Sequence, residues 1–185
     1  MIRIILIIIV SIFTTFQVIF NQTTNGWVQQ NSGTLLDLND VCFFNKDTGW
    51  VVGSTGKILS TVDGGEHWTS QSSGTIQDLH AVFFVNSQEG WAVGSNGKVL
   101  HTNNGGIDWF VQAINMFSLI KSVYFVNDST GWLCGDSIPS VYKTTDGGEH
   151  WICISASEYR NNSIYFIDEN KGWVAGPGVS ATLNG

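Results

Sequence analysis

The chain has 185 residues, of which 43% are hydrophobic and 12% charged, enough for one ordinary domain with an apolar core. Eight Lys and Arg residues against 15 Asp and Glu residues give a formal net charge of −7. A phosphate-binding surface needs clustered Lys and Arg, so the composition argues against nucleic acid as a partner.

The first twenty residues are typical of a targeting segment. Arg3 precedes a long apolar run that begins at Ile4, which is the pattern of an export signal peptide. The run is longer than most signal sequences and shows no A-x-A cleavage site, so an uncleaved anchor that tethers the protein to a membrane through residues 4–20 is the open alternative. Either interpretation predicts an exported protein that is extracellular, periplasmic or associated with the cell envelope. Residues 1–20 are therefore kept apart from the fold, which we expect in residues 21–185.

A repeat of 41 residues organises the rest of the chain. Gly-Trp pairs begin at Gly49, Gly90, Gly131 and Gly172, and each follows an apolar run such as Val82–Val85. The predicted units are 27–68, 69–109, 110–151 and a truncated 152–185. A repeat of this length is typical of a stacked or ring-shaped architecture.

Each unit predicts four short antiparallel strands separated by turns. In the second unit these are Val82–Val85, Gly90–Gly94, Lys98–Thr102 and Trp109–Gln112. Four strands in about 40–45 residues is the spacing of a β-propeller blade. Unbroken apolar runs indicate strands buried on both faces, and we expect the tryptophan rings to pack between blades. A parallel β-solenoid is the alternative, but its coils are usually shorter.

A second motif closes each complete unit: TVDGGEHW at 61–68, TNNGGIDW at 102–109 and TTDGGEHW at 144–151. It resembles the Asp-box of bacterial sialidase-type repeats. The whole unit is similar to the repeat of the photosystem II stability/assembly factor family, over residues 27–185. The resemblance implies an all-β fold, a β-propeller of four-stranded antiparallel blades, present here as an open fragment of about three to four blades.

The Asp-box is interpreted as a hairpin cap. The side-chain oxygens of Thr61 and Asp63 are expected to accept backbone N–H groups of the turn. Asn104 takes the place of Asp63 in the second box, and an amide can cap a turn but cannot act as a charged base. One central carboxylate per box is too few for calcium. The three cysteines are an odd number without a CxxC pair, and we predict neither a metal site nor a cofactor.

The sequence suggests three candidate functions. A sialidase-type glycoside hydrolase would need an arginine triad, but Arg160 is the one arginine beyond residue 20, and Tyr124 and Tyr165 occupy core positions. A photosystem II assembly chaperone would be expected to carry an arginine-rich patch, whereas the lysines here are scattered. The preferred hypothesis is a non-catalytic, secreted or cell-envelope module that binds a protein or a glycan.

Binding is expected on the loops opposite the Asp-boxes. These are Leu35–Leu36, Ile76–Gln77, Met116–Ser118, Asp136–Pro139 and Glu158–Arg160. The last two depart most from the repeat, so Asp136, Tyr159 and Arg160 are the predicted ligand-binding residues. The sequence ends inside a fourth box, while Trp27–Gln30 matches an outer strand. We therefore expect an open arc with a bare edge at the fourth blade, and a closed four-blade ring is the alternative.

Overall fold

A computed structural model describes residues 26–112, 114, 119–136, 140–155 and 160–185. The chain divides by its contacts into two units, Met1–Gln30 and Asn31–Gly185, and every strand of the described residues belongs to the second. Within the described residues, no helix is long and apolar enough to cross a membrane. The predicted signal or anchor at residues 1–20 lies outside these residues.

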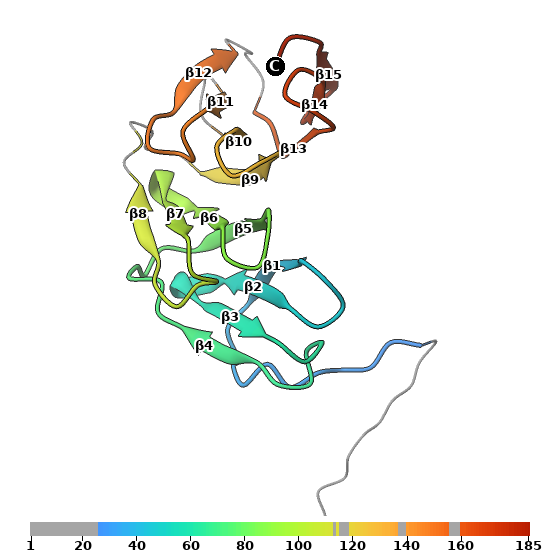
Figure 1. Cartoon of the computed structure of the whole chain (residues 1–185), viewed down its shortest axis with the longest axis vertical. Coiled ribbons are helices and arrows are strands. Elements are labelled where there is room, and N and C mark those ends of the chain that lie inside the picture. The colour runs from blue at the N-terminus through green and yellow to red at the C-terminus, as the bar shows by residue number, and fades with distance from the viewer. Residues whose placement is uncertain (1–25, 113, 115–118, 137–139, 156–159) are drawn as a thin grey trace, which may run out of the picture. The chain divides into compact units, whose positions relative to one another are not determined.

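In the part of the chain that the structure describes, fifteen strands form four antiparallel sheets in chain order (Figure 1). Each sheet runs from its first strand to its last without a crossover, which confirms the predicted blades and excludes a parallel solenoid in the described chain. The strands of the first sheet are β1 (Leu38–Phe43), β2 (Gly49–Gly53), β3 (Ile58–Thr61) and β4 (Thr69–Gln71); those of the second are β5 (Leu79–Phe84), β6 (Gly90–Gly94), β7 (Val99–Thr102) and β8 (Phe110–Gln112). Those of the third are β9 (Ile120–Phe125), β10 (Gly131–Gly135), β11 (Val141–Thr144) and β12 (Ile152–Ser155); those of the fourth are β13 (Ser163–Phe166), β14 (Gly172–Ala175) and β15 (Val179–Thr182).

The Gly-Trp pair explains how one blade packs on the next. A Cβ atom added to Gly90 would lie 2.5 Å from the ring of Phe84 on the paired strand, so only glycine leaves room for that ring. The opposite face of the Phe84 ring stacks on Trp50 of the preceding blade, with 3.5 Å between ring centroids. Trp91 stacks on Phe125 in the same way at 3.5 Å, and Trp132 on Phe166 at 3.6 Å. The predicted packing of tryptophan between blades is therefore confirmed at all three blade interfaces.

The unit is open at both ends of its row of blades. The fourth sheet has three strands, and the outward-facing Val41 and Phe43 of the first sheet are 57% and 43% exposed. The predicted partial propeller is thus confirmed.

Every complete blade has two ends with different connections. The turn between its first two strands and the Asp-box hairpin lie together at one end, the box end, where Gly64 N–H donates to Asp47 O at 2.8 Å. The turn between the second and third strands lies with the connection to the next blade at the other end, the loop end, where Thr55 N–H donates to Asp78 Oδ1 at 2.8 Å. A ligand site can therefore be sought at either end.

Candidate functional site

The Asp-box side chains are used to cap their own hairpins. The Thr61 hydroxyl donates to Asp63 Oδ1 at 2.8 Å and accepts from Gly65 N–H at 2.9 Å. Asp63 Oδ1 also accepts from His67 N–H at 3.0 Å, and this backbone bond is the main cause that lowers the pKa of Asp63 to about 2. Asp146 of the third box has its pKa lowered to about 2 mainly by the backbone N–H of His150.

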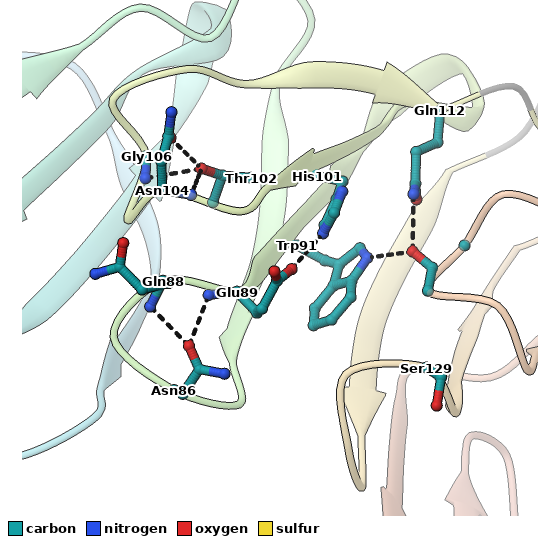
Figure 2. A network of polar contacts seen from close by, with 12 residues as sticks. Asn86, Gln88, Glu89, Trp91, His101, Thr102, Asn104, Gly106, Gln112 and Ser129 are labelled. Atoms are coloured by element: carbon teal, nitrogen blue, oxygen red, sulfur yellow. Dashed lines mark hydrogen bonds and ion pairs between the residues drawn. The ribbon is translucent and has the colours of Figure 1, made fainter.

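The second box keeps these bonds with an amide in place of the carboxylate (Figure 2). Thr102 donates to Asn104 Oδ1 at 3.0 Å. Asp108 N–H donates to the same oxygen at 3.0 Å. The capping role predicted from the sequence is confirmed in all three complete boxes.

The boxes also join neighbouring blades. Gly147 O of the third box accepts from Trp91 Nε1 at 2.9 Å and from Gln112 Nε2 at 2.8 Å (Figure 2). Gly105 O of the second box accepts from Trp50 Nε1 at 3.0 Å and from Gln71 Nε2 at 3.1 Å. The box end is thus a structural part of the blade interface.

Two boxes bring together side chains that metals can use. The ligand atoms of Asp63, Glu66 and His67 lie within 4.8 Å of one another, as do those of Asp146, Glu149 and His150. However, His67 Nδ1 is already hydrogen-bonded to Asp63 Oδ2 at 2.7 Å, and Asp63 caps the turn. We therefore assign these groups to the hairpin rather than to a metal.

A hollow of about 570 Å³ opens at the loop end of the first blade. It is lined by Thr55, Gly56, Lys57, Gln71, Ser72, Ser73, Gly74, Thr75 and Ile76. The hollow is shallow and open to solvent, so a ligand bound there would keep part of its surface exposed. The lining combines one cation, several hydroxyls and the 82% exposed Ile76, groups that can contact both polar and apolar parts of a ligand.

The wall of this hollow is a tight turn packed against the next connection. Thr55 and Gly56 have positive φ angles of 55° and 72°. A Cβ at Gly56 would lie 2.1 Å from Thr75 O, so the two segments touch through backbone. Asp78 Oδ1 accepts from Thr55 N–H at 2.8 Å, while Lys57 Nζ donates to Ser70 Oγ at 3.2 Å. These hydrogen bonds thus fix the positions of the segments that border the hollow.

The second blade repeats this turn. Asn96, with a φ of 55°, takes the place of Thr55, and Lys98 takes the place of Lys57. Asn96 Nδ2 donates to Gln77 Oε1 at 2.6 Å, which ties the turn to the connection that borders the hollow. Lys57 and Lys98 therefore present two cations at the same end of adjacent blades.

The residues predicted to bind a ligand are only partly described. Asp136 pairs with Lys121, whose Nζ lies 2.6 Å from Asp136 Oδ1 and also donates to Asn162 Oδ1 at 2.9 Å. Arg160 is exposed, and Tyr159 lies outside the described residues, as do Met116–Ser118 of the expected loops. The predicted site of these three residues thus stays a prediction.

Sequence reasoning identified the Ile76 loop but missed Thr55 and Lys57. The repeated sequences Ser54–Lys57 and Ser95–Lys98 could have identified them, since both read Ser-x-Gly-Lys at the same repeat position.

Charge is divided unevenly between the two ends of the blades. Ten of the 15 acidic residues lie in the turns and boxes of the box end. They are Asp47, Asp63, Glu66, Glu89, Asp108, Asp128, Asp146, Glu149, Asp168 and Glu169. The loop end carries Lys57, Lys98, Lys121 and Arg160 beside Asp37, Asp78 and Asp136, so its charges are more nearly balanced. An acidic ligand is therefore repelled less at the loop end than at the box end.

Residues 19–116, more than half of the chain, match the family model described as Photosynthesis system II assembly factor YCF48. The chain belongs to this family. The predicted family resemblance is thereby confirmed. No curated protein sequence matches the chain.

Solved structures give the same fold. The structure described as YCF48 bound to D1 peptide is 14% identical and has a TM-score of 0.60, with 85% of this chain and 84% of that chain covered. YCF48 from Cyanidioschyzon merolae is 18% identical with a TM-score of 0.56, with 81% and 68% covered. The GH74 enzyme of Niastella koreensis is 18% identical with a TM-score of 0.65, and the match covers 75% of this chain and 26% of the enzyme. At these identities the likeness concerns the fold.

Proposed function

We propose that this chain is an exported, non-catalytic module that binds a protein segment at the loop end of its blades. The observation that carries the proposal is the hollow beside Lys57, which combines hydrogen-bonding groups with an exposed apolar side chain. The structure of a family member bound to D1 peptide supports a peptide as the ligand. The apolar run after Arg3 supports export.

Two lysines at this end favour a segment with carboxylate groups. Lys57 lines the hollow, and Lys98 directly follows the matching turn of the next blade. Opposite charges across an interface speed encounter and fix the orientation of the bound segment. We expect the apolar side chains of the segment to contact Ile76.

A glycoside hydrolase is the alternative suggested by the sialidase-type motif and by the GH74 neighbours. The use of Asp63 and Asp146 as caps favours the non-catalytic role, because a carboxylate committed to a hairpin is poorly placed for acid or base catalysis. A glycan would remain compatible with the hollow but would not use its cations.

Binding can be tested with the D1 peptide as the probe, by fluorescence anisotropy with the full chain. We expect saturable binding that weakens at least fivefold in the double variant Lys57→Ala/Lys98→Ala, because both cations are removed from the loop end. Lys46→Ala is the matched control, since Lys46 is an exposed lysine of the box end. Equal affinity in the double variant and the wild type would place the ligand elsewhere, and no binding would argue against this peptide as the ligand.

A further inference from the structure

Three polar side chains from separate segments meet at the loop end, where the third and fourth blades adjoin. Lys121 lies on β9, Asp136 directly follows β10, and Asn162 directly precedes β13. Lys121 Nζ lies 2.6 Å from Asp136 Oδ1 and donates to Asn162 Oδ1 at 2.9 Å. One amine thus contacts a carboxylate and a carboxamide at the same time, although Lys121 and Asn162 are 41 residues apart in the chain.

Backbone contacts hold the carboxylate and the carboxamide in place. Asp136 N–H donates to Leu119 O at 2.9 Å, and Asn162 N–H donates to Ala175 O at 2.7 Å. A Cβ atom at Gly135 would lie 2.0 Å from Leu119 O, so the segment before Asp136 lies directly against the segment that leads into β9. The two groups therefore meet the amine from fixed backbone positions.

The other interfaces between described blades do not carry this set of groups. At the first interface the equivalent positions hold Asn39, Ser54 and His80, and at the second they hold His80, Ser95 and Lys121. At the second, the His80 ring contacts Ser95 Oγ at 3.0 Å. Neither set contains a carboxylate. Among the interfaces that the structure describes, the third is thus the one that combines an amine, an acid and an amide.

We propose that Lys121 and Asn162 become joined by an isopeptide bond that the chain forms by itself, with Asp136 as the base and acid. Asp136 takes a proton from the Lys121 amine, and the neutral Nζ attacks Cγ of Asn162. The Nζ–Cγ bond forms and the Cγ–Nδ2 bond breaks. The two protons that Nζ gives up leave with Nδ2 as an ammonium ion, and Asp136 returns to its carboxylate form. No electrons are transferred, so the reaction needs no oxidant.

The distances suit this attack. A C=O bond is about 1.2 Å long, so Cγ of Asn162 lies within about 4 Å of Nζ, and reacting atoms need about 3–3.5 Å. Rotation about the last bonds of the lysine side chain closes this gap. The side chains of Lys121 and Asp136 are 29% and 25% exposed, and Asp136 Oδ1 is itself buried, which limits competition from water. Because the bond forms once per chain and ammonium diffuses away, even a slow step goes to completion.

The bond would fasten two neighbouring blades to each other at their inner strands. It links β9 to the segment before β13 and closes a loop between positions 41 residues apart. A covalent cross-link of this kind restricts the unfolded chain, as a disulfide does. This role goes beyond ligand binding and is independent of the hollow beside Lys57.

Digestion of the denatured full chain with trypsin, followed by mass spectrometry, tests the bond. Trypsin does not cut after a lysine whose amine is acylated, so we expect Val99–Lys143 to stay whole and to carry Asn161–Lys171 as a branch. The branched peptide should be lighter than its two parts together by one ammonia molecule. A succinimide at an Asn-Gly pair also loses ammonia but joins no peptides, so the branch decides. Complete cleavage after Lys121 in the wild type would overturn the proposal.

Four variants assign the roles of the three groups. Lys121→Arg keeps the positive charge but removes the nucleophile, and Asn162→Ala removes the amide, so neither should form the branch. Asp136→Asn should lower its yield at least tenfold, since a positioned acid or base contributes about 10²–10⁴ in rate. Lys98→Arg is the matched control at the loop end of the second blade and should keep the branch. Circular dichroism checks that each variant is folded.

Two results from these variants would contradict the assignment. A branch that persists in Asn162→Ala would mean that another group accepts the lysine. An equal yield in Asp136→Asn and the wild type would remove Asp136 from the reaction.

Discussion

At the scale of single residues, the central position of the Asp-box shows that capping depends on hydrogen bonding and not on charge. Asp63 and Asp146 cap their turns with a carboxylate, and Asn104 makes the same two bonds with an amide. The cap therefore needs a side-chain oxygen that accepts hydrogen bonds, and it does not need the negative charge that Asp63 and Asp146 carry. The charge adds a dependence on pH, because the folded chain lowers the pKa of both aspartates to about 2.

This difference predicts a defined acid sensitivity. A carboxylate whose pKa is lower in the folded than in the unfolded chain stabilises the fold above its unfolded pKa, and this contribution is lost as the pH falls toward the folded value. For Asp63 and Asp146 the window runs from about pH 3.8 to about pH 2. In the double variant Asp63→Asn/Asp146→Asn we expect the free energy of unfolding, measured by urea denaturation, to fall less steeply across this window.

The second box supplies a control in the opposite direction. Asn104→Asp introduces a carboxylate into an equivalent cap, so we expect its stability to fall more steeply between pH 4 and pH 2, the window of the two native caps. A pH dependence that is the same in all three proteins would contradict the assignment of the charge to the caps.

At the scale of elements, the turn between β2 and β3 depends on a close approach of backbone. Gly56 has a φ of 72° and leaves no space for a Cβ beside Thr75 O. Gly74 has a similar φ of 69°, but no heavy atom lies within 4 Å of an added Cβ. The two glycines lie on the same hollow and differ in the space around them.

The two glycines predict different losses in the free energy of unfolding when each is replaced by alanine. Gly74→Ala should lower the free energy of unfolding by about 1–2 kcal/mol, the cost of a left-handed conformation for a residue with a side chain. Gly56→Ala should cost about 1–3 kcal/mol more, since the turn must also move away from Thr75. Urea denaturation followed by tryptophan fluorescence measures both. Equal costs would mean that the two segments are not in contact.

The blades were predictable from sequence, whereas the hollow was not. Periodicity located each strand because burial on both faces leaves a continuous apolar run: Val82–Val85 was expected as a strand, and β5 covers Leu79–Phe84. The earlier start includes an irregularity in register between Leu79 and Ala81 that no apolar pattern signals. The hollow arises where the turn at Gly56 meets the connection at Thr75, a contact that depends on backbone geometry rather than on residue type.

At the scale of the whole unit, stability is distributed along a row of blades. Each blade contacts its neighbours through their inner strands, as β1 does with β5, β5 with β9 and β9 with β13. In such arrays the total free energy of unfolding is close to a sum of two contributions: the stability of each blade by itself and that of each interface between neighbouring blades. The fourth sheet has one covered face and three strands, and its buried apolar side chains are Ile164 and Phe166. It therefore depends on the third interface more than an inner blade depends on any one contact.

Trp132→Ala is consequently expected to release the fourth sheet before the rest. The change removes the ring that stacks on Phe166 and leaves a cavity, at a cost of about 3–5 kcal/mol for a buried tryptophan. Because β5–β7 are covered on both sides by other interfaces, this cost should fall on β13–β15. Native-state hydrogen exchange should show at least tenfold faster exchange for amides of Ser163–Thr182, with little change in Leu79–Thr102. Uniformly faster exchange in both segments would instead mean that the blades unfold as a single cooperative unit, in which the loss of one interface is shared by all four sheets.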